Sequence, residues 1–417
     1  MNKTLGIVIE NYVSGGSDVM ASLLARQLSG WDVVIFMNRG NDDRNLTKDI
    51  DLRRIRLVRY GWKTLAELGE IPVRLRRRGH NILAVIVRCF NLGIRYPHIF
   101  LSALYLSQLF RRYRIDFVLS NNGGYPGGEM CRAAVFAARL RRINALMVIH
   151  NMPTRPPTIL RPMEVIMDRL VGRCATLVAV SNAVSEAAGQ IRSLGKPVSV
   201  IENAVEPPSL QPSERLHVGV TDILCIGAIS AWKDQIKALE VYRRFVRTLT
   251  AHHPDLVVPK LSLIGPTADS DYYQRLVDAI ATNQTDGERV SIAGYTDVRP
   301  YLARPGQLLL ITSNVEGLPL VLLEAMSYGV PAVSTNVGGI GAVITNGVNG
   351  KISPIDDLEG LAHSLFQYVT ESKTYVEASK RCIEIFNARY SSAGLIEKYQ
   401  SLIASLSCKP RTMRAAA

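Results

Sequence analysis

The chain has 417 residues, enough for two or three domains, and its 47% hydrophobic and 20% charged residues exclude a disordered or collagen-like protein. The formal net charge is +13, and it is unevenly distributed. Residues 1–200 hold 29 basic and 14 acidic side chains, whereas residues 201–417 hold 20 and 22. A basic first half predicts contact with an anionic partner, either nucleic acid or a membrane surface.

Three further classes of protein are excluded at this stage. The apolar start is too short before Glu10 for the core of a signal peptide. The apolar runs at residues 82–87 and 99–110 are bounded by arginines, and we expect no segment to reach the ~20 apolar residues of a spanning helix. The six cysteines have neither a C-x-x-C pair nor metal-ligand spacing. A reduced, cytosolic protein is the resulting expectation.

Short apolar runs alternate with helical patterns along the chain, which is typical of βα units and parallel sheets. In the first half we expect strands at 5–9, 33–37, 117–120, 146–149 and 177–180, and a helix near 19–28. A proline-rich stretch at 207–213 predicts a linker. Strands are then expected at 223–226, 260–264, 290–293, 308–312 and 332–334.

The pattern therefore predicts an α/β protein of two doubly wound, Rossmann-like domains, residues 1–206 and 207–385. Ligands of open parallel sheets bind beyond the carboxyl ends of the strands. Two such domains facing each other would place a site in a central cleft.

The segment from 308 to 352 carries the clearest chemical signal. The expected strand at 308–312 is followed by a loop with Glu316 and Gly317 and by a helix expected at 319–326. Pro319 suits a first helical turn, and free N–H groups at a helix start bind anions such as a diphosphate. Glu324 is the lone acid of an otherwise apolar helix, and burying it would be costly without hydrogen bonds. The alternative is that Glu316 is simply an acid near the helix N-cap and that Glu324 lies at a helix edge facing solvent.

This segment resembles the E-x7-E region of the retaining GT-B-fold glycosyltransferases of family 4 (group 1). The residues that carry the resemblance are Glu316 through Met326, Gly329 through Val333, Gly338-Gly339 and Asn346 through Gly350. Weaker matches are Ser14-Gly15-Gly16, His150-Asn151, Gly227 through Lys233, Gly265 and Tyr295. Residues 386–408 resemble the family's terminal helix, which packs back on the first domain, and residues 409–417 are a basic tail.

The resemblance implies a role for each matched residue. Glu324 would accept hydrogen bonds from the donor ribose, and Glu316, with His150, would contact the transferred sugar. The diphosphate would be bound by Lys233 and by backbone N–H groups near Leu320 and Val321, at the start of the helix. Gly317 and Leu318, in the loop that precedes the helix, would also contact the donor. Gly16 would let the backbone approach the phosphates, Gly227 would also contact the donor, and Tyr295 or its neighbours would flank the base.

One position departs from the family's pattern. Family members commonly carry an arginine after the glycine that matches Gly227, whereas this chain has Ala228. A cation that stabilises a leaving diphosphate in a dry site contributes substantially to the rate. Either Lys233 and the helix start suffice, or another basic residue substitutes, or activity is reduced.

Residues 39–114 hold 17 basic and 6 acidic side chains, and Arg76, Arg77 and Arg78 form one of the clusters. Basic clusters among apolar and aromatic residues are typical of membrane-surface binding. A solvated charged face is the alternative, and no recognition motif favours nucleic acid. We expect these arginines to face an anionic membrane surface on the acceptor side.

Together these features predict a hexosyltransferase type of enzyme, retaining and dependent on a UDP- or GDP-sugar. We expect its acceptor to be a saccharide, lipid-linked, in polysaccharide, lipopolysaccharide or glycolipid synthesis. We expect the enzyme to be cytoplasmic and peripherally associated with the inner face of the cell membrane. Neither a metal nor another cofactor is expected, because the resemblance implies that the helix start and the lysine take the place of a metal, and Asp269-Ser270-Asp271 looks like a helix cap. A sugar-nucleotide epimerase of the same fold and a catalytically silent sugar-nucleotide binder remain alternatives.

Overall fold

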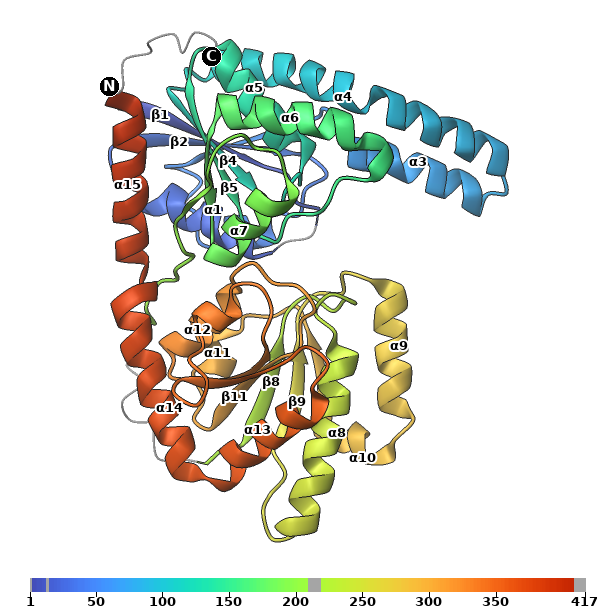
Figure 1. Ribbon diagram of the computed structural model, residues 1–417, viewed down its shortest axis with the longest axis vertical. Coiled ribbons are helices and arrows are strands. Elements are labelled where there is room, and N and C mark those ends of the chain that lie inside the picture. The colour runs from blue at the N-terminus through green and yellow to red at the C-terminus, as the bar shows by residue number, and fades with distance from the viewer. Residues whose placement is uncertain (1, 13–14, 209–218, 409–417) are drawn as a thin grey trace. The chain divides into compact units, whose positions relative to one another are not determined.

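The computed structural model describes residues 2–12, 15–208 and 219–408 (Figure 1). The chain divides into two compact units, one of Met1–Ile201 with Ile396–Ala417 and one of Glu202–Leu395. The boundary between them lies a few residues before the one expected from the sequence. Most of the expected proline-rich linker falls outside the described residues, as do Ser14 and the basic tail.

The first unit is built on a seven-stranded parallel sheet with the order β3-β2-β1-β4-β5-β6-β7. Its strands are β1 (Lys3–Ile9), β2 (Trp31–Asn38), β3 (Arg56–Tyr60), β4 (Phe117–Asn122), β5 (Asn144–Ile149), β6 (Thr176–Ala179) and β7 (Ser199–Val200). The central strands β1, β4 and β5 are buried over nearly their whole length, because helices cover both faces of the sheet. This explains why they read as continuous apolar runs.

The helices of this unit follow the strands in βα alternation. They are α1 (Gly16–Gln27), α2 (Arg44–Thr47), α3 (Leu65–Arg77), α4 (Asn81–Arg112), α5 (Glu129–Leu140), the short η1 (Thr158–Leu160), α6 (Arg161–Cys174) and α7 (Asn182–Ile191). The last helix, α15 (Ser392–Cys408), joins the unit from residue 396 onward. Asn144 Nδ2 donates to the carbonyl of Leu406 at 2.7 Å, and Gln400 Nε2 donates to Ser29 Oγ at 2.8 Å.

The second unit contains a six-stranded parallel sheet with the order β10-β9-β8-β11-β12-β13. Its strands are β8 (Asp222–Ile226), β9 (Lys260–Ile264), β10 (Val290–Gly294), β11 (Gln307–Ile311), β12 (Ala332–Thr335) and β13 (Gly350–Ser353). Its helices are α8 (Gln235–His252), α9 (Ser270–Ala281), α10 (Gln284–Arg289), α11 (Arg299–Leu302), α12 (Leu320–Ser327), α13 (Leu358–Thr370) and α14 (Ser372–Ile385), with η3 (Ile340–Ala342) and the π-helical η4 (Phe386–Tyr390). The core lies between the sheet and helices α8 and α13.

The α/β fold class is confirmed, and each expected strand is present with small shifts at its ends. The strands that the sequence did not indicate are β3, β7 and β13, all at the edges of their sheets. An edge strand lacks the continuous apolar run of a central one. In β3, for instance, Arg56 and Arg59 interrupt the pattern.

The expectation that no segment is long and apolar enough to span a membrane is wrong. The two apolar runs belong to one 32-residue helix, α4, which passes that test by length and composition with a mean hydropathy of 1.2. Pro97 lies inside this helix without ending it, although a proline removes one backbone donor and its ring crowds the carbonyl four residues earlier. Core helices of soluble proteins can be as long and as apolar, but only 17% of the most apolar 18-residue stretch of α4 is buried.

Candidate functional site

The central feature of the second unit is an ion pair between two neighbouring loops. Strands β8 and β11 pair in parallel, so the loops at their carboxyl ends lie together. From the first loop, Lys233 Nζ donates to Glu316 Oε1 of the second at 2.5 Å. Ser313 Oγ donates to the same oxygen at 2.6 Å. Glu316 is only 6% exposed, and these two donors compensate the cost of burying its charge.

Hydrogen bonds also join the two loops through their backbones. The N–H of Asn314 donates to the Trp232 carbonyl at 2.8 Å, and its Oδ1 accepts from Lys237 Nζ at 2.6 Å. Its Nδ2 donates to Asp234 Oδ2 at 3.2 Å. Thr312 Oγ1 donates to the Asp234 carbonyl at 2.8 Å. The position of Lys233 relative to Glu316 is therefore fixed by the framework of both loops.

Helix α12 begins directly after this loop. Leu320 and Val321 are its first two residues, and backbone N–H groups at such positions have no partner within their own helix. Pro319 is the N-cap, with an extended backbone, rather than a residue of the first turn as expected. The expectation was wrong by one position because the proline's fixed φ fits the N-cap as well. Leu318 is buried, and its carbonyl accepts from Asn203 Nδ2 at 3.0 Å.

Two glycines outside the E-x7-E stretch allow the close approach of backbone to this site. A Cβ on Gly338 would lie 1.7 Å from the carbonyl oxygen of Glu316, and the φ of Gly338 is +55°. The N–H of Gly339 donates to the carbonyl of Gly317 at 2.9 Å. A Cβ on Gly265 would lie 2.0 Å from the carbonyl oxygen of Gly227. A side chain at 338 or 265 would therefore displace the backbone of the loops that carry the site.

The remaining donor-side residues lie along the same edge of the sheet. Gly227 follows β8 and contacts the Lys233 side chain, since a Cβ there would be 3.4 Å from it. Tyr295 follows β10 and is exposed, while the preceding Gly294 accepts from the Gly265 N–H at 2.8 Å. Glu324 is half-buried, one turn into α12. Glu316 is buried and does not cap α12, whose N-cap is Pro319, whereas Glu324 keeps partial contact with solvent.

A hydrogen-bond network in the first unit contains the predicted His150. His150 Nε2 lies 2.8 Å from Asn121 Oδ1, and Asn121 Nδ2 donates to the Ser17 carbonyl at 2.9 Å. Since an amide oxygen only accepts, Nε2 carries the proton and Nδ1 is the acceptor nitrogen. Burial lowers the pKa of His150 to about 4, so the ring is neutral at pH 7. Gly16, the first residue of α1, adjoins Ser17 in this network.

A buried acid that the sequence did not single out lies near this network. Glu10 follows β1 and accepts from the Met130 N–H at 2.7 Å. Burial, followed by the charge of Glu129, raises the pKa of Glu10 to about 7. His98 Nδ1 lies 3.0 Å from Glu129 Oε1, and this contact raises the pKa of His98. Position at the end of a buried strand was the one sequence signal that could have indicated Glu10.

The predicted arginines Arg76, Arg77 and Arg78 are exposed at the carboxyl end of α3. They belong to the first unit, like His150 and Gly16. The structure thus brings Lys233 and Glu316 together in the second unit, and places His150 near Gly16 in the first.

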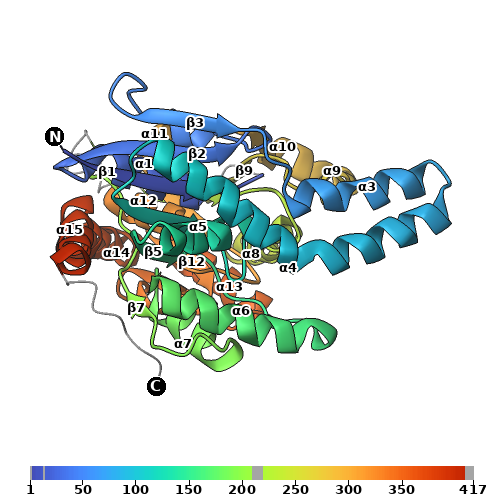
Figure 2. The same ribbon diagram turned by 90° about the horizontal axis from the view of Figure 1, so that it is seen from above.

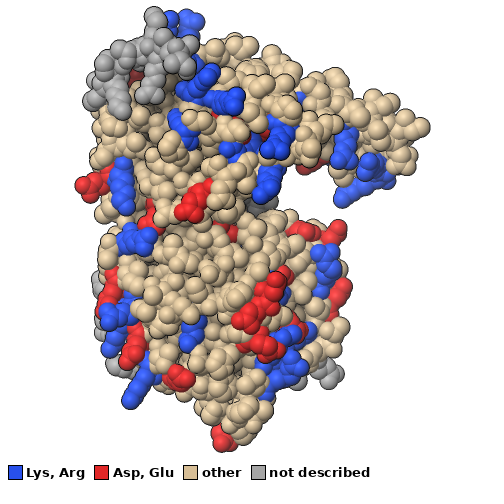
Figure 3. Space-filling view, in the orientation of Figure 1, with Lys and Arg blue, Asp and Glu red and all other residues tan. Residues whose placement is uncertain are grey.

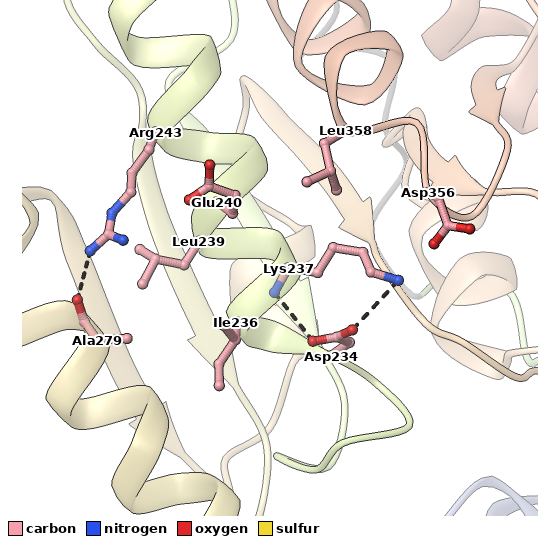
Figure 4. Close-up of a pocket in the computed structure, with 9 residues that line it drawn as sticks. All are labelled: Asp234, Ile236, Lys237, Leu239, Glu240, Arg243, Ala279, Asp356 and Leu358. Carbon is pink, nitrogen blue, oxygen red and sulfur yellow. Dashed lines mark hydrogen bonds and ion pairs between the residues drawn. The ribbon is translucent and has the colours of Figure 1, made fainter.

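A pocket of about 370 Å³ adjoins the Lys233 loop on the side of α8 (Figure 4). It is lined by Asp234, Ile236, Lys237, Leu239, Glu240, Arg243, Ala279, Asp356 and Leu358. Figure 4 shows Lys237 reaching toward Asp234, the N-cap of α8, while Arg243 donates to the Ala279 carbonyl at 2.6 Å. None of the lining residues was predicted from the sequence to contact the donor.

Within the described part of the chain, no three His, Cys, Asp or Glu side chains are arranged to bind a metal ion. Asp269 is the N-cap of α9 and accepts from the Tyr272 N–H at 2.9 Å. The expectation that the Asp269-Ser270-Asp271 motif caps a helix is therefore confirmed.

Comparison with known families identifies the class of protein. The family model described as "Glycosyl transferases group 1" matches residues 220–371, and the one described as "Glycosyltransferase Family 4" matches residues 14–208. These two matches together take in most of the chain. It belongs to the group 1, family 4 glycosyltransferases, and its two parallel sheets form the GT-B fold.

Individual relatives match only part of the chain and at low sequence identity. The chain is 27% identical to an N-acetyl-alpha-D-glucosaminyl L-malate synthase of Bacillus anthracis over 42% of its own length and 43% of that protein. It is 31% identical to the lipopolysaccharide core biosynthesis glycosyltransferase LpsE of Rhizobium meliloti over 35% of its length and 42% of that protein. The matches thus span less than half of these relatives.

A solved structure resembles nearly the whole chain. The crystal structure of Anabaena HepE in complex with UDP matches with a TM-score of 0.71 and 17% identity, covering 97% of this chain and all of that one. At this identity the likeness shows the fold alone.

Proposed function

We propose that this chain transfers a sugar from a nucleoside diphosphate donor to a hydroxyl group of a saccharide acceptor, with retention of configuration. The observation that carries the proposal is the buried Lys233–Glu316 pair at the start of α12. An ammonium and helix N-terminal N–H groups suit a diphosphate, and a carboxylate suits sugar hydroxyls. The site therefore offers complementary chemistry for both parts of a nucleotide sugar.

In this proposal the leaving nucleoside diphosphate is stabilised without a metal. Lys233 and the N–H groups of Leu320 and Val321 would bind its developing charge, since preorganised donors and dipoles stabilise a leaving anion effectively. Attack would occur on the face from which the diphosphate leaves, with a phosphate oxygen taking the acceptor's proton. Glu324 would accept hydrogen bonds from the ribose, and Tyr295 would flank a UDP or GDP base.

With alanine at position 228, Lys233 is the cation that this proposal assigns to the diphosphate. Lys237 does not substitute for an arginine at 228, because its Nζ donates to Asn314 Oδ1 at 2.6 Å and lies 3.5 Å from Asp234. We therefore expect a slower enzyme with a weaker diphosphate contact than a homologue that has the arginine.

The acceptor in this proposal is a lipid-linked saccharide of polysaccharide, lipopolysaccharide or glycolipid synthesis, reached from the cytoplasmic face of the membrane. The net charge of the first unit supports it, as does the name of the relative that acts in lipopolysaccharide core biosynthesis. His150, neutral and buried, would accept a hydrogen bond from a sugar hydroxyl at Nδ1.

A panel of UDP-, GDP- and ADP-sugars, screened first by thermal shift, identifies the donor, because a ligand that binds the folded state raises Tm. Release of nucleoside diphosphate with and without saccharide acceptors then separates the functions. Acceptor-dependent release supports transfer. Conversion of the donor sugar without acceptor would identify an epimerase, and binding without turnover would identify a silent binder.

A further inference from the structure

Helices α3 and α4 form an arm that projects beyond the sheet of the first unit, as two perpendicular views show (Figures 1 and 2). The arm is held together along its length. Thr64 caps α3, and Asn91 Nδ2 on α4 donates to the Leu68 carbonyl on α3 at 2.9 Å. At its base, Trp62 Nε1 donates to Ser102 Oγ of α4 at 2.9 Å. The arm is therefore a defined element of the first unit.

One face of α4 is apolar and exposed along most of the helix. We call this face the α4 stripe, and it comprises Ile82, Ile86, Phe90, Phe100 and Leu104, which are 45–80% exposed. These positions recur at multiples of about 3.6 residues, so they share one face over a length of about 33 Å. Single exposed apolar residues need no explanation, but a continuous stripe of this length marks an interaction surface.

The charges around the α4 stripe favour an anionic partner. From residue 71 to residue 115 the sequence contains nine arginines and no aspartate or glutamate. In Figure 3 the outer part of the arm carries blue and tan surface without red. A second copy of this chain would bring like charges together, whereas the head groups of an anionic bilayer would neutralise them.

The packing of α4 within the first unit favours an orientation in the plane of a bilayer over one that crosses it. Ile99, Ala103, Leu106 and Phe110 lie on a different face of α4 and are at most 1% exposed, packed within the first unit. Crossing the bilayer would require α4 to leave this core. An orientation in the plane of the membrane requires no such change.

We propose that the α3–α4 arm lies in the surface of an anionic bilayer, with the α4 stripe among the acyl chains and the α3 arginines at the head groups. This inference deepens the proposed lipid-linked acceptor, but the surface itself does not depend on the donor chemistry. It assigns membrane contact to one arm of the first unit, where the sequence indicated only basic clusters.

Flotation with vesicles tests the proposal on the full-length protein. We expect binding to phosphatidylcholine vesicles that contain phosphatidylglycerol, and weaker binding without it or at high salt. Ile82→Ser with Ile86→Ser and Phe90→Ser should lower the partition coefficient about tenfold or more. Arg76→Ser with Arg77→Ser and Arg78→Ser should remove mainly the part of vesicle binding that is sensitive to salt.

Matched controls lie in the second unit. Leu256→Ser with Val257→Ser replaces exposed apolar residues, and Lys373→Ser with Lys380→Ser replaces exposed cations of α14. Neither should change vesicle binding. The proposal is overturned if the wild type does not bind anionic vesicles, or if the Ile82/Ile86/Phe90 variant binds as well as the wild type.

A label on Cys89, which is exposed in α4, reports the depth of the helix. In a background where Cys174 and Cys408 are serine, an environment-sensitive dye at Cys89 should shift to the blue on anionic vesicles. Lipids brominated high on the acyl chain should quench it more than lipids brominated at the chain end. Stronger quenching at the bilayer centre would contradict an in-plane helix.

The outcome is separable from the proposed transferase activity. Donor binding and transfer to a water-soluble acceptor should be unchanged in the Ile82/Ile86/Phe90 variant. If that variant instead turns a dimer into a monomer in solution and still binds vesicles, the stripe is a contact between copies and the membrane assignment is wrong. Absence of transfer by the wild type would refute the proposed function and leave vesicle binding unaffected.

Discussion

Lys233 Nζ donates a hydrogen bond to Glu316 Oε1 across two loops that are 83 residues apart in sequence. In the proposed enzyme both side chains have other partners when the donor is bound: a diphosphate for the lysine and sugar hydroxyls for the carboxylate. The pair therefore neutralises two functional charges until the donor replaces it. Because Glu316 is more buried than Lys233, we expect the lysine to move and the carboxylate to stay.

Replacing Lys233 tests the cation of the site. In Lys233→Met, the buried carboxylate of Glu316 keeps Ser313 as a side-chain donor but loses its ion pair, and the diphosphate loses a charge-assisted hydrogen bond. We expect nucleoside diphosphate affinity, measured by calorimetry, to fall about 10- to 100-fold. Lys237→Met is the matched control, since Lys237 is bound to Asn314. Equal losses in the two variants would contradict the assignment.

Ser313 is expected to act as a positioning residue for Glu316. Ser313→Ala removes one of the two donors to Oε1 and frees the carboxylate to rotate, so kcat should fall about tenfold with a smaller change in donor KM. Ser313→Thr keeps a hydroxyl and should recover most of the rate. If the alanine and threonine variants behaved alike, the hydroxyl would have no such role.

Introducing the missing arginine should strengthen diphosphate binding. Ala228 is half-buried beside Gly227, so Ala228→Arg would add a second cation close to Lys233. We expect tighter binding of the nucleoside diphosphate, by a few-fold to tenfold, in the same titration. Ala228→Gln controls for side-chain size. Weaker binding in the arginine variant than in the glutamine variant would show that the diphosphate lies elsewhere.

The pH dependence of stability should report His150. Its folded pKa is about 4 because of burial, whereas an unfolded histidine titrates near 6.5. Between these values the unfolded chain binds a proton that the folded chain does not, so stability falls as pH decreases from 6.5 toward 4. At pH 5 this term is worth about 2 kcal/mol. His150→Gln should therefore lose less Tm than the wild type between pH 7 and pH 5.

Glu10 should give the opposite sign in the same experiment. Burial raises the pKa of Glu10 in the folded chain to about 7, above the usual value of 4.5. Between these two pKa values the folded chain keeps the Glu10 proton, whereas the unfolded chain releases it. The free energy of unfolding therefore decreases as pH rises toward 7. Glu10→Gln removes the loss, and its Tm relative to the wild type should increase from pH 5 to pH 8. A constant Tm difference would show that Glu10 is ionised when folded.

Much of the fold followed from the sequence because central parallel strands are buried on both faces and read as apolar runs. The edge strand β3 and the single helix α4 did not follow, since arginines interrupt both patterns. Burial of Arg56 or Arg88 cannot be judged without knowing what packs beside them.

The candidate site was predicted only in part, for a related reason. The resemblance to the family's E-x7-E region indicated Glu316 and Glu324, and the weaker match of Gly227 through Lys233 indicated Lys233. The contribution of Asn314 arises from a contact with Lys237, 77 residues away in sequence, which no local pattern encodes. Ser313 lies only three residues from Glu316, but nothing in the loop sequence indicates that its hydroxyl faces that carboxylate. Glycine 338 likewise matters through its approach to the Glu316 carbonyl.

The most direct test of the proposed function is the effect of Glu316→Gln on sugar transfer. The amide is nearly isosteric and keeps the loop filled, but it removes the charge that pairs with Lys233 and would bind the sugar hydroxyls. With the donor identified by the panel, acceptor-dependent release of nucleoside diphosphate should fall at least about 100-fold, while the variant remains folded by thermal shift. Transfer at the wild-type rate by a folded Glu316→Gln protein would contradict the assignment.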